Sequence, residues 1–425
     1  WETLPLAALI IYSGLKSISK DIEEASKIDG IIGIRKMLQL DIPYMMPNIL
    51  MALVLMIIAA SFTFDPIYVT NNIAPPMAFV DLAYYAYQQF FGGIIGYAAV
   101  LILIMSFIAT VLAYFFIKTL PGGVNKSQIA KNPSSRWQSF SQIFPNKEVN
   151  IFIVYIIAII FLAFFLFPIA WIFLESLKTT AQIYTTPPII FPKSISVEAY
   201  LKVITDGLPY IITSTITAIG VMLLTILVGA PAAYSMARYN FGGKKFLLFI
   251  LFIYSLPGEI FMLSIYKIIS FLGLMNTWWA LILTFPIFVL PVVIWMNYNF
   301  YKNFPPHIEE AAQMDGMNIG KTYFKIILPL SQDGIAVAVL YAFLMSWGAL
   351  LFPLALAYSP FNMNFLAPSG ALTFSVYIGG TIGHEASFYN LLGASSFISL
   401  IPSVIILYYM RDKLDKLYRV GGSKG

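Results

Sequence analysis

Long apolar stretches are the feature that most constrains how this chain folds. They lie at about 45–69, 94–118, 151–174, 208–236, 246–271, 278–300, 332–357 and 391–410. A helix needs about 20 predominantly apolar residues to cross the ~30 Å hydrocarbon core of a bilayer, and each stretch is long enough. We therefore predict an all-α integral membrane protein.

A shorter apolar run, Leu4 to Leu15, follows Trp1 and is too short to span a bilayer. We interpret it as the end of a helix that begins before Trp1, which brings the expected count to about nine transmembrane helices. The composition agrees, because 59% of the residues are hydrophobic, 11% are charged and the mean hydropathy is +0.81. A water-soluble core of ordinary size does not hold that much apolar surface.

The same composition excludes several kinds of chemistry. The chain has no cysteine and two histidines, so we expect neither a disulfide framework nor a metal site. The formal net charge is +5, but no basic run carries interleaved aromatic residues. In a membrane protein such an excess fits basic cytoplasmic loops better than a nucleic-acid partner.

A polar pattern occurs twice between the apolar stretches. Residues 24–43 read EASKIDGIIGIRKMLQLDIP, and residues 310–329 read EAAQMDGMNIGKTYFKIILP. At offsets of 5, 6 and 19 from the first residue, the shared positions are Glu24, Asp29, Gly30 and Pro43 in the first repeated loop and Glu310, Asp315, Gly316 and Pro329 in the second. The constant separation of 286 residues (310 − 24) indicates a duplicated unit.

Each repeated loop is predicted to form a short helix, a glycine stop and a second helix. Ser19 and the pair Pro305-Pro306 suit helix starts, and Gly30 and Gly316 suit the left-handed position after a helix end. A small apolar face is expected on each short helix, from Ile18, Ile22 and Ala25 in one and Ile308, Ala311 and Ala312 in the other, flanked by Glu23, Glu24, Glu309 and Glu310. Such a face fits a groove on a soluble partner. The alternative, a helix lying on lipid, is disfavoured by the acids beside an anionic inner leaflet.

Charge distribution predicts the sidedness. Residues 119–150 are rich in Gly, Pro, Ser and basic residues and read as a flexible basic linker. Alternate threading places this linker, both repeated loops and the basic C-terminal tail on one side, which the positive-inside rule makes the cytoplasm. Loops 70–93, 175–207 and 358–390 then face outward. The expected location is the cell (cytoplasmic) membrane, multi-pass, with a cytoplasmic C-terminus.

The EAxxxDG pattern with its later proline resembles the cytoplasmic coupling loop of ABC importer permeases, and the chain resembles the maltose-type sugar permeases over nearly its whole length. Residues 64–70 (FDPIYVT) and 96–99 (GYAA) are similar to the last spans of the larger permease of a pair. Residues 232–238 (AAYSMAR), 272–277 (LGLMNT) and the tail GGSKG look like the smaller permease. Ser26, in place of a second alanine, and Asp333, in place of a proline, depart from the family pattern.

This resemblance implies a domain organisation in two ABC-importer permease modules. Residues 1–118 would be the C-terminal part of a first module, 119–150 the cytoplasmic linker, and 151–425 a second module with six transmembrane helices. It also implies a transport component and not an enzyme. ATP and Mg would be bound by two partner ATP-binding subunits, since no GxxxxGK[ST] loop occurs here. An extracellular substrate-binding protein, a mono- or oligosaccharide substrate and membrane lipid complete the expected partners, and no cofactor is expected on the chain itself.

Candidate site residues follow from the repeat and from the resemblance. The ATPase-coupling candidates are Glu24, Ala25, Asp29, Gly30, Pro43, Glu310, Ala311, Ala312, Asp315, Gly316 and Pro329. The substrate-pathway candidates are Phe62, Thr63 and Asp65, which fall where the larger maltose-type permease places sugar contacts, and Glu259, a carboxyl inside an apolar stretch. Each pathway candidate also has a structural interpretation, as packing or as a hydrogen bond within the helices.

Other functions remain open at this point. The chain is also compatible with an ABC permease for another small polar solute such as glycerol phosphate. Internal repeats occur in secondary transporters too, which need no ATPase partner. An intramembrane enzyme is the weakest alternative, because no Ser/His, paired-Asp or metal-ligand constellation lies in the apolar stretches.

Overall fold

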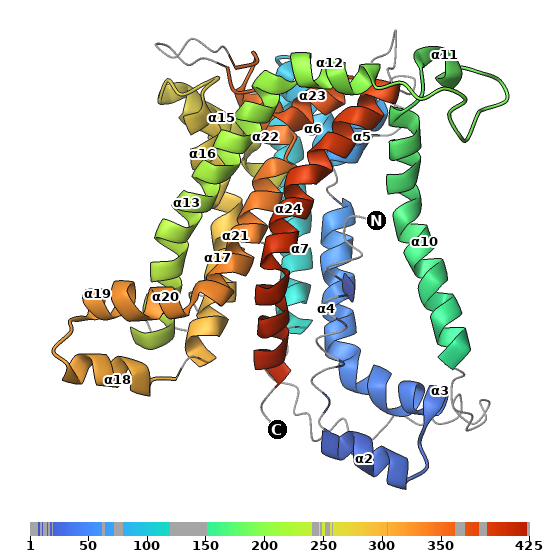
Figure 1. Ribbon diagram of the computed structural model, residues 1–425. Coiled ribbons are helices and arrows are strands. Elements are labelled where there is room, and N and C mark those ends of the chain that lie inside the picture. Colours follow the sequence, from blue (N-terminus) through green and yellow to red (C-terminus); the bar gives the residue numbers. More distant parts are fainter. Residues whose placement is uncertain are drawn as a thin grey trace. The chain divides into compact units, whose positions relative to one another are not determined.

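The computed structural model describes residues 7–8, 11, 15, 18, 20–61, 64–71, 80–119, 151–239, 246, 249–250, 256, 258–303, 305–361, 370–381 and 389–422. Every regular element in these ranges is a helix (Figure 1). The chain falls into two compact units, of which unit 1 comprises residues 1–62, 107–168 and 419–425 and unit 2 comprises 63–106 and 169–418.

Unit 1 contains the first repeated loop and the helix that follows it. Its elements are α2 (Lys20–Ile28), α3 (Gly33–Lys36), the π turn η1 (Met37–Asp41) and α4 (Ile42–Ser61). Parts of two long apolar helices, α7 (Ile95–Thr119) and α10 (Ile151–Ser176), also belong to it.

Unit 2 contains most of the chain. Its elements are α5 (Asp65–Asn71), α6 (Leu82–Phe91), α11 (Thr180–Ile183), α12 (Glu198–Asp206), α13 (Leu208–Tyr239), η2 (Gly258–Phe261), α15 (Met262–Phe271), α16 (Trp278–Thr284), α17 (Pro286–Asn303), α18 (His307–Met314), α19 (Ile319–Thr322), η3 (Tyr323–Ile327), α20 (Leu328–Leu330), α21 (Gln332–Trp347), α22 (Leu351–Leu356), α23 (Phe374–Gly380) and α24 (Tyr389–Gly422). Helix α13 packs against α16, α17 and α21. Small residues allow this close packing, since a Cβ on Gly220 would lie 2.6 Å from Cδ1 of Ile282.

The described helices agree with the predicted membrane class. Four are long and apolar enough to span a bilayer, namely Ala158–Ser176, Leu208–Tyr239, Trp278–Lys302 and Tyr389–Met410. A fifth results if Ile319–Leu330 and Gly334–Trp347, which meet at a bend of 78°, form one span. The four single helices and Gly334–Trp347 lie on predicted stretches, whereas Ile319–Leu330 belongs to the second repeated loop. The all-α membrane fold is confirmed. The count of nine spans and the division into two modules stay predictions.

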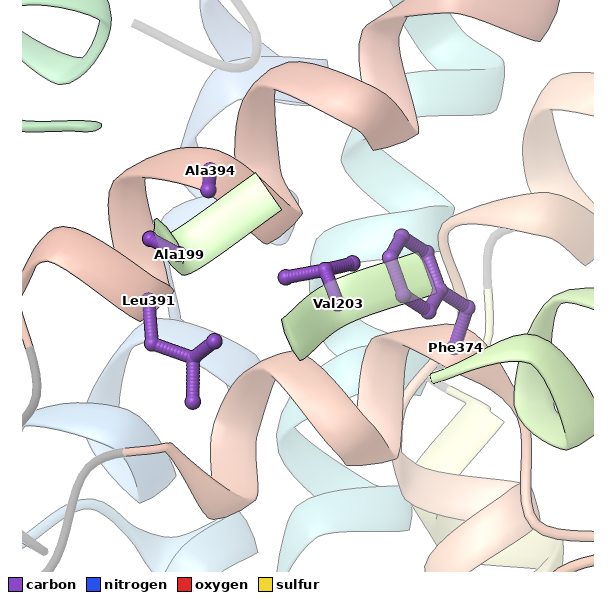
Figure 2. Close-up of a cluster of buried hydrophobic side chains, with 5 residues drawn as sticks. All are labelled: Ala199, Val203, Phe374, Leu391 and Ala394. Atoms are coloured by element: carbon purple, nitrogen blue, oxygen red, sulfur yellow. The ribbon is translucent and has the colours of Figure 1, made fainter. Parts of the chain in front are cut away.

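A compact apolar cluster fixes the end of α13 at which Leu208 lies. Ala199 and Val203 of α12 pack with Phe374 of α23 and with Leu391 and Ala394 of α24 (Figure 2). All five side chains are buried. The cluster therefore joins α12 to two later elements of unit 2.

The connection between α15 and α16 is held by one asparagine. Asn276 has a φ of 59°, a left-handed conformation that asparagine tolerates better than most residues. Its side-chain oxygen accepts hydrogen bonds from the backbone N–H of Tyr358 (3.0 Å) and Ser359 (3.2 Å), and its Nδ2 donates to the hydroxyl of Ser359 (2.8 Å). The LGLMNT segment thus owes its shape to contacts about 80 residues away in sequence.

Candidate functional site

The two repeated loops have the same order of elements. In the first, α2 is followed by α3, η1 and α4, and in the second, α18 is followed by α19, η3 and α20. Subtracting 286 from the bounds of α19 (319 and 322) and η3 (323 and 327) gives the bounds of α3 (33 and 36) and η1 (37 and 41). The sequence repeat is therefore also a structural repeat.

Both short helices end at a glycine, as predicted. Gly30 and Gly316 have φ values of 68° and 77°. After the glycine, the N–H of Ile31 donates to the carbonyl of Ser26 (2.8 Å), and the N–H of Met317 donates to the carbonyl of Ala312 (3.0 Å). This bond pattern closes a helix by satisfying carbonyls that the last turn leaves free.

The structure tests the predicted start of the short helix in the second loop but not in the first. Helix α18 begins directly after Pro306, as predicted from the proline pair. Helix α2 begins at Lys20, while Ser19 lies outside the described residues.

The small residues of each short helix are partly exposed and partly buried within the protein, and do not form one outer face. Ser26 and Ala312, which correspond across the repeat, are buried within the chain, at 5% and 2% exposure. Ala25 and Ala311 are exposed, together with Glu24 and Glu310. An apolar face turned to a partner stays a prediction for Ala25 and Ala311, whereas the residue after each of these alanines is buried within the chain. Ala312 accordingly supports α18 from within and does not lie on its outer face.

Ser26 replaces an alanine without leaving a polar atom unsatisfied. Its hydroxyl donates to the backbone carbonyl of Glu23 at 2.8 Å, inside its own helix. A buried serine that bonds back to the preceding turn behaves much like the alanine at the equivalent position, Ala312. The other departure from the family pattern, Asp333, is the second residue of α21.

Each loop has a π turn that ends two residues before its proline. The turns end at Asp41 and Ile327, and Pro43 and Pro329 are the second residues of α4 and α20. Proline lacks an N–H and disturbs the regular hydrogen bonds of the preceding turn. A π turn is a common way for a helix to absorb such a disturbance. The two prolines are thus placed where each loop continues into the next helix.

A buried ion pair attaches the second loop to α13. Nε of Arg238 donates to Oε1 of Glu309 at 2.6 Å, and the hydroxyl of Tyr234 donates to Oε2 at 3.1 Å. Glu309 is 7% exposed. Tyr234 also packs in an apolar cluster with Tyr301 and Tyr323. Both oxygens of the carboxylate therefore have donors on one spanning helix.

The equivalent acid of the first loop, Glu23, is held differently. Its Oε1 accepts from Nζ of Lys36 at 3.1 Å, within the same loop, and the Glu23 side chain is 44% exposed. Nζ of Lys36 also lies 3.8 Å from Oδ1 of Asp41. Burial raises the pKa of Asp41 above its usual range, and the Lys36 ammonium opposes that shift.

The most exposed apolar side chains of the two loops occupy one equivalent position. Ile28 is 86% exposed and Met314 is 89% exposed, and 314 − 286 = 28. On each helix this residue shares the outer side with the glutamate four residues earlier and is followed by an exposed aspartate. Sequence reasoning missed both residues. The available signal was an apolar residue directly before the Asp-Gly pair in each copy.

The substrate-pathway candidates are not brought together by the described residues. Phe62 and Thr63 lie outside them. Asp65 is the first residue of α5, and Glu259 lies in the 3₁₀ turn η2, where the structure describes its backbone alone. The part of the chain that the structure describes contains no group of three or more His, Asp or Glu able to hold a metal.

An aromatic cluster adjoins Asp65 and was not anticipated. The ring of Phe64 lies 5.5 Å from that of Tyr68 and 5.0 Å from that of Tyr87, and Tyr87 lies 4.7 Å from Phe91. Phe64 is buried, while Tyr68 and Tyr87 remain partly exposed. Packed rings of this kind hold the start of α5 against α6.

Residues 225–420 match the family described as "Binding-protein-dependent transport system inner membrane component". These residues are a permease domain of that family. The domain contains the second repeated loop and Arg238, whereas the first repeated loop lies outside the matched residues. The resemblance to ABC importer permeases is thereby confirmed.

Curated permeases resemble the chain over most of their own lengths. The sulfoquinovosyl glycerol transport system permease protein SmoH of Agrobacterium fabrum is 29% identical over 70% of this chain and 100% of that protein. The trehalose transport system permease protein SugB of Mycobacterium tuberculosis is 29% identical over 61% and 93%. A solved chain of a bacterial ABC transporter that imports alginate aligns with a TM-score of 0.48 and 20% identity over 66% of this chain and 98% of that one.

Proposed function

We propose that this chain is the membrane-spanning component of an ATP-driven ABC importer for sugars, and that its two repeated loops dock on two ATP-binding subunits. The observation that carries the proposal is one exposed surface that occurs twice. It consists of Glu24, Ala25, Ile28 and Asp29 in the first loop and Glu310, Ala311, Met314 and Asp315 in the second. Two equal surfaces call for two equal partners.

The chemistry of this surface fits a groove on a soluble protein. An isoleucine or methionine side chain that becomes fully buried contributes about 1.5–3 kcal/mol. A short helix that presents one such side chain beside acids can insert it into a pocket while the acids meet polar or basic groups at the rim. ATP and Mg would be held by the partners, whose closure moves the two loops and with them the helices that follow.

Sugars are the substrate class that the relatives support. The matched permeases carry names for sulfoquinovosyl glycerol, trehalose and diacetylchitobiose transport. Aromatic rings and carboxyls can hold a neutral, densely hydroxylated solute. We therefore keep Phe62, Thr63, Asp65 and Glu259 as pathway candidates, with the aromatic cluster around Phe64 holding Asp65 in place. An extracellular binding protein would deliver the sugar.

The domain organisation and topology belong to the same proposal. A first module at 1–118, a cytoplasmic linker at 119–150 and a second module at 151–425 place both loops and the C-terminus in the cytoplasm of a multi-pass membrane protein. A permease for another polar solute, such as glycerol phosphate, shares this arrangement and differs in substrate competition. A secondary transporter would show uptake without an ATP-binding subunit.

The decisive experiment removes the apolar contact from both loops of the full-length protein. The double variant Ile28→Glu with Met314→Glu should lose copurification of the ATP-binding subunits and sugar-stimulated ATP hydrolysis, because an added carboxylate does not enter an apolar pocket. The matched control is Lys27→Gln with Gln313→Glu, which changes the charge by the same amount on neighbouring exposed residues. Retained association and hydrolysis in the Ile28/Met314 variant would refute the docking role.

A further inference from the structure

Helix α12 carries apolar side chains on two of its faces. Ala199 and Val203 are buried against α23 and α24 (Figure 2). On another face, Leu201 and Ile204 are 61% and 55% exposed. Packing within the protein explains the first pair and leaves more than half of each side chain of the second pair exposed.

The residues of α12, from 198 to 206, divide into three sectors when they are placed about 100° apart around a helix. One sector, about 60° wide on this wheel, is apolar and exposed and consists of Leu201 and Ile204. The next is polar and exposed and consists of Thr205, Glu198, Lys202 and Asp206. The third is buried at Ala199 and Val203 and partly buried at Tyr200.

The polar sector is internally connected. The hydroxyl of Thr205 donates to the carbonyl of Lys202 at 3.0 Å and to Oδ1 of Asp206 at 3.1 Å. Its two acids and one lysine leave no excess of positive charge. Attraction to anionic headgroups therefore does not account for the exposed apolar sector beside it.

The position of α12 relative to the bilayer follows from the length of α13, the helix that comes after it. Gly207 alone separates α12 from α13, and Figure 1 shows α12 turned away from the direction of α13. Helix α13 has 32 residues, about 48 Å at 1.5 Å per residue, so it exceeds the ~30 Å hydrocarbon core. The end of α13 at Arg238 reaches the polar second loop. The end at Leu208 therefore reaches the opposite headgroup region.

We propose that α12 is an interfacial helix whose apolar sector lies in the surface of the phospholipid bilayer. Leu208, two residues after α12, is exposed too, and so are Leu223 and Leu227 farther along the span of α13. A helix at this depth has protein, lipid and water on three sides, and the three sectors match those surroundings. A soluble partner would leave the continuity with the span unexplained.

Single cysteines test the proposal directly, because the chain has none of its own. Leu201→Cys and Ile204→Cys probe the apolar sector, Lys202→Cys and Thr205→Cys the polar sector, and Val203→Cys the buried one. Each variant of the full-length protein is assembled with its ATP-binding subunits in phospholipid nanodiscs and spin-labelled. Accessibility to oxygen, which concentrates in lipid, is then compared with accessibility to a water-soluble nickel chelate.

The expected ratio of oxygen to nickel accessibility is severalfold higher at positions 201 and 204 than at 202 and 205. If the labels at positions 201 and 204 were as accessible to the nickel chelate as those at 202 and 205, the apolar sector would face water and the proposal would be overturned. Protection of 201 and 204 from both reagents would overturn it in favour of a covering protein chain. Unchanged ATP hydrolysis of the labelled 202 and 205 variants shows that the fold is retained.

Discussion

The two repeated loops share a backbone and differ in how each holds its first glutamate. Glu23 pairs with Lys36 of its own loop, and the side chains are 44% and 24% exposed. Glu309 pairs with Arg238 of α13, and both side chains are nearly buried. The outer surfaces that would meet a partner are equivalent, so the two loops differ in the ion pair that each one forms inside the protein. Among the described residues, the first loop's glutamate pairs within its own loop, whereas the second loop's glutamate is attached to a spanning helix.

Removing the basic residue of each ion pair should give the largest difference in stability between variants of the two loops. Arg238→Ala leaves the Glu309 carboxylate buried beside Tyr234 alone, which costs about 3–5 kcal/mol for a broken buried pair. Lys36→Ala breaks an exposed pair and costs about 0–1 kcal/mol. Thermal unfolding of the purified protein, followed together with sugar-stimulated ATP hydrolysis, measures both. Equal effects of the two substitutions would contradict the asymmetry.

A double variant distinguishes the charge from the packing of Arg238. Glu309→Gln removes the unpaired charge and keeps an acceptor for the Tyr234 hydroxyl. Combined with Arg238→Ala, it should recover part of the stability that Arg238→Ala loses, because an uncharged amide is cheaper to bury than a carboxylate. The matched pair Lys36→Ala with Glu23→Gln should show little coupling. Additive losses in the Arg238 and Glu309 variants would mean that the ion pair is not the attachment.

The glycines should behave alike in both loops. Gly30 and Gly316 have left-handed backbones, and a Cβ at either position meets no atom within 4 Å. Alanine at each position should therefore cost about 1–2 kcal/mol through backbone strain alone. Gly30→Ala and Gly316→Ala are compared by thermal unfolding, with the exposed helical Lys27→Ala as control. Unequal losses would show that the two helix ends are not equivalent.

In these loops the sequence predicted the features that depend on residues close together in the chain. Spacing predicted the left-handed glycines, and the proline pair predicted the start of α18 directly after Pro306, because a helix end depends on the few residues around it. The π turns η1 and η3 have no residue signature and were not anticipated. The contact of Glu309 with Arg238 joins residues 71 positions apart and depends on how α18 packs on α13.

The sequence pattern also did not predict which apolar side chains of the two loops are exposed. Ile28 and Met314 are apolar residues near helix ends, and pattern reasoning assigns such residues to a buried face. Conversely, Ala312 belonged to a predicted outer face and is buried, because α18 packs through it on its own protein. Only the placement of neighbouring helices decides which alanine of an Ala-Ala pair turns outward.

Replacing Ser26 by alanine should have a small effect. The Ser26 hydroxyl bonds to its own helix, and the equivalent residue of the second loop is already alanine. Loss of that single bond costs at most about 1 kcal/mol, partly offset by the better helix propensity of alanine. Ser26→Leu is the contrast, since added volume at a buried site costs about 1–3 kcal/mol. A large loss in Ser26→Ala would indicate a role for the hydroxyl beyond its own helix.

The smallest expected difference concerns Asp41, whose counterpart across the repeat is the fully buried Ile327. Burial raises the pKa of Asp41, so the folded protein binds this proton more tightly than the unfolded chain does. The resulting stability is fully present below the unfolded pKa of about 3.9 and is lost as the pH rises through the folded pKa. Asp41→Asn removes this dependence and, at neutral pH, should be neutral or stabilising by about 0.5 kcal/mol or less, because Lys36 offsets part of the burial cost. Thermal unfolding between pH 4 and 7, with the exposed Asp29→Asn as control, measures it. A clear loss of stability in Asp41→Asn at neutral pH would show that the attraction of Lys36 outweighs burial and that the first loop also depends on a buried ion pair.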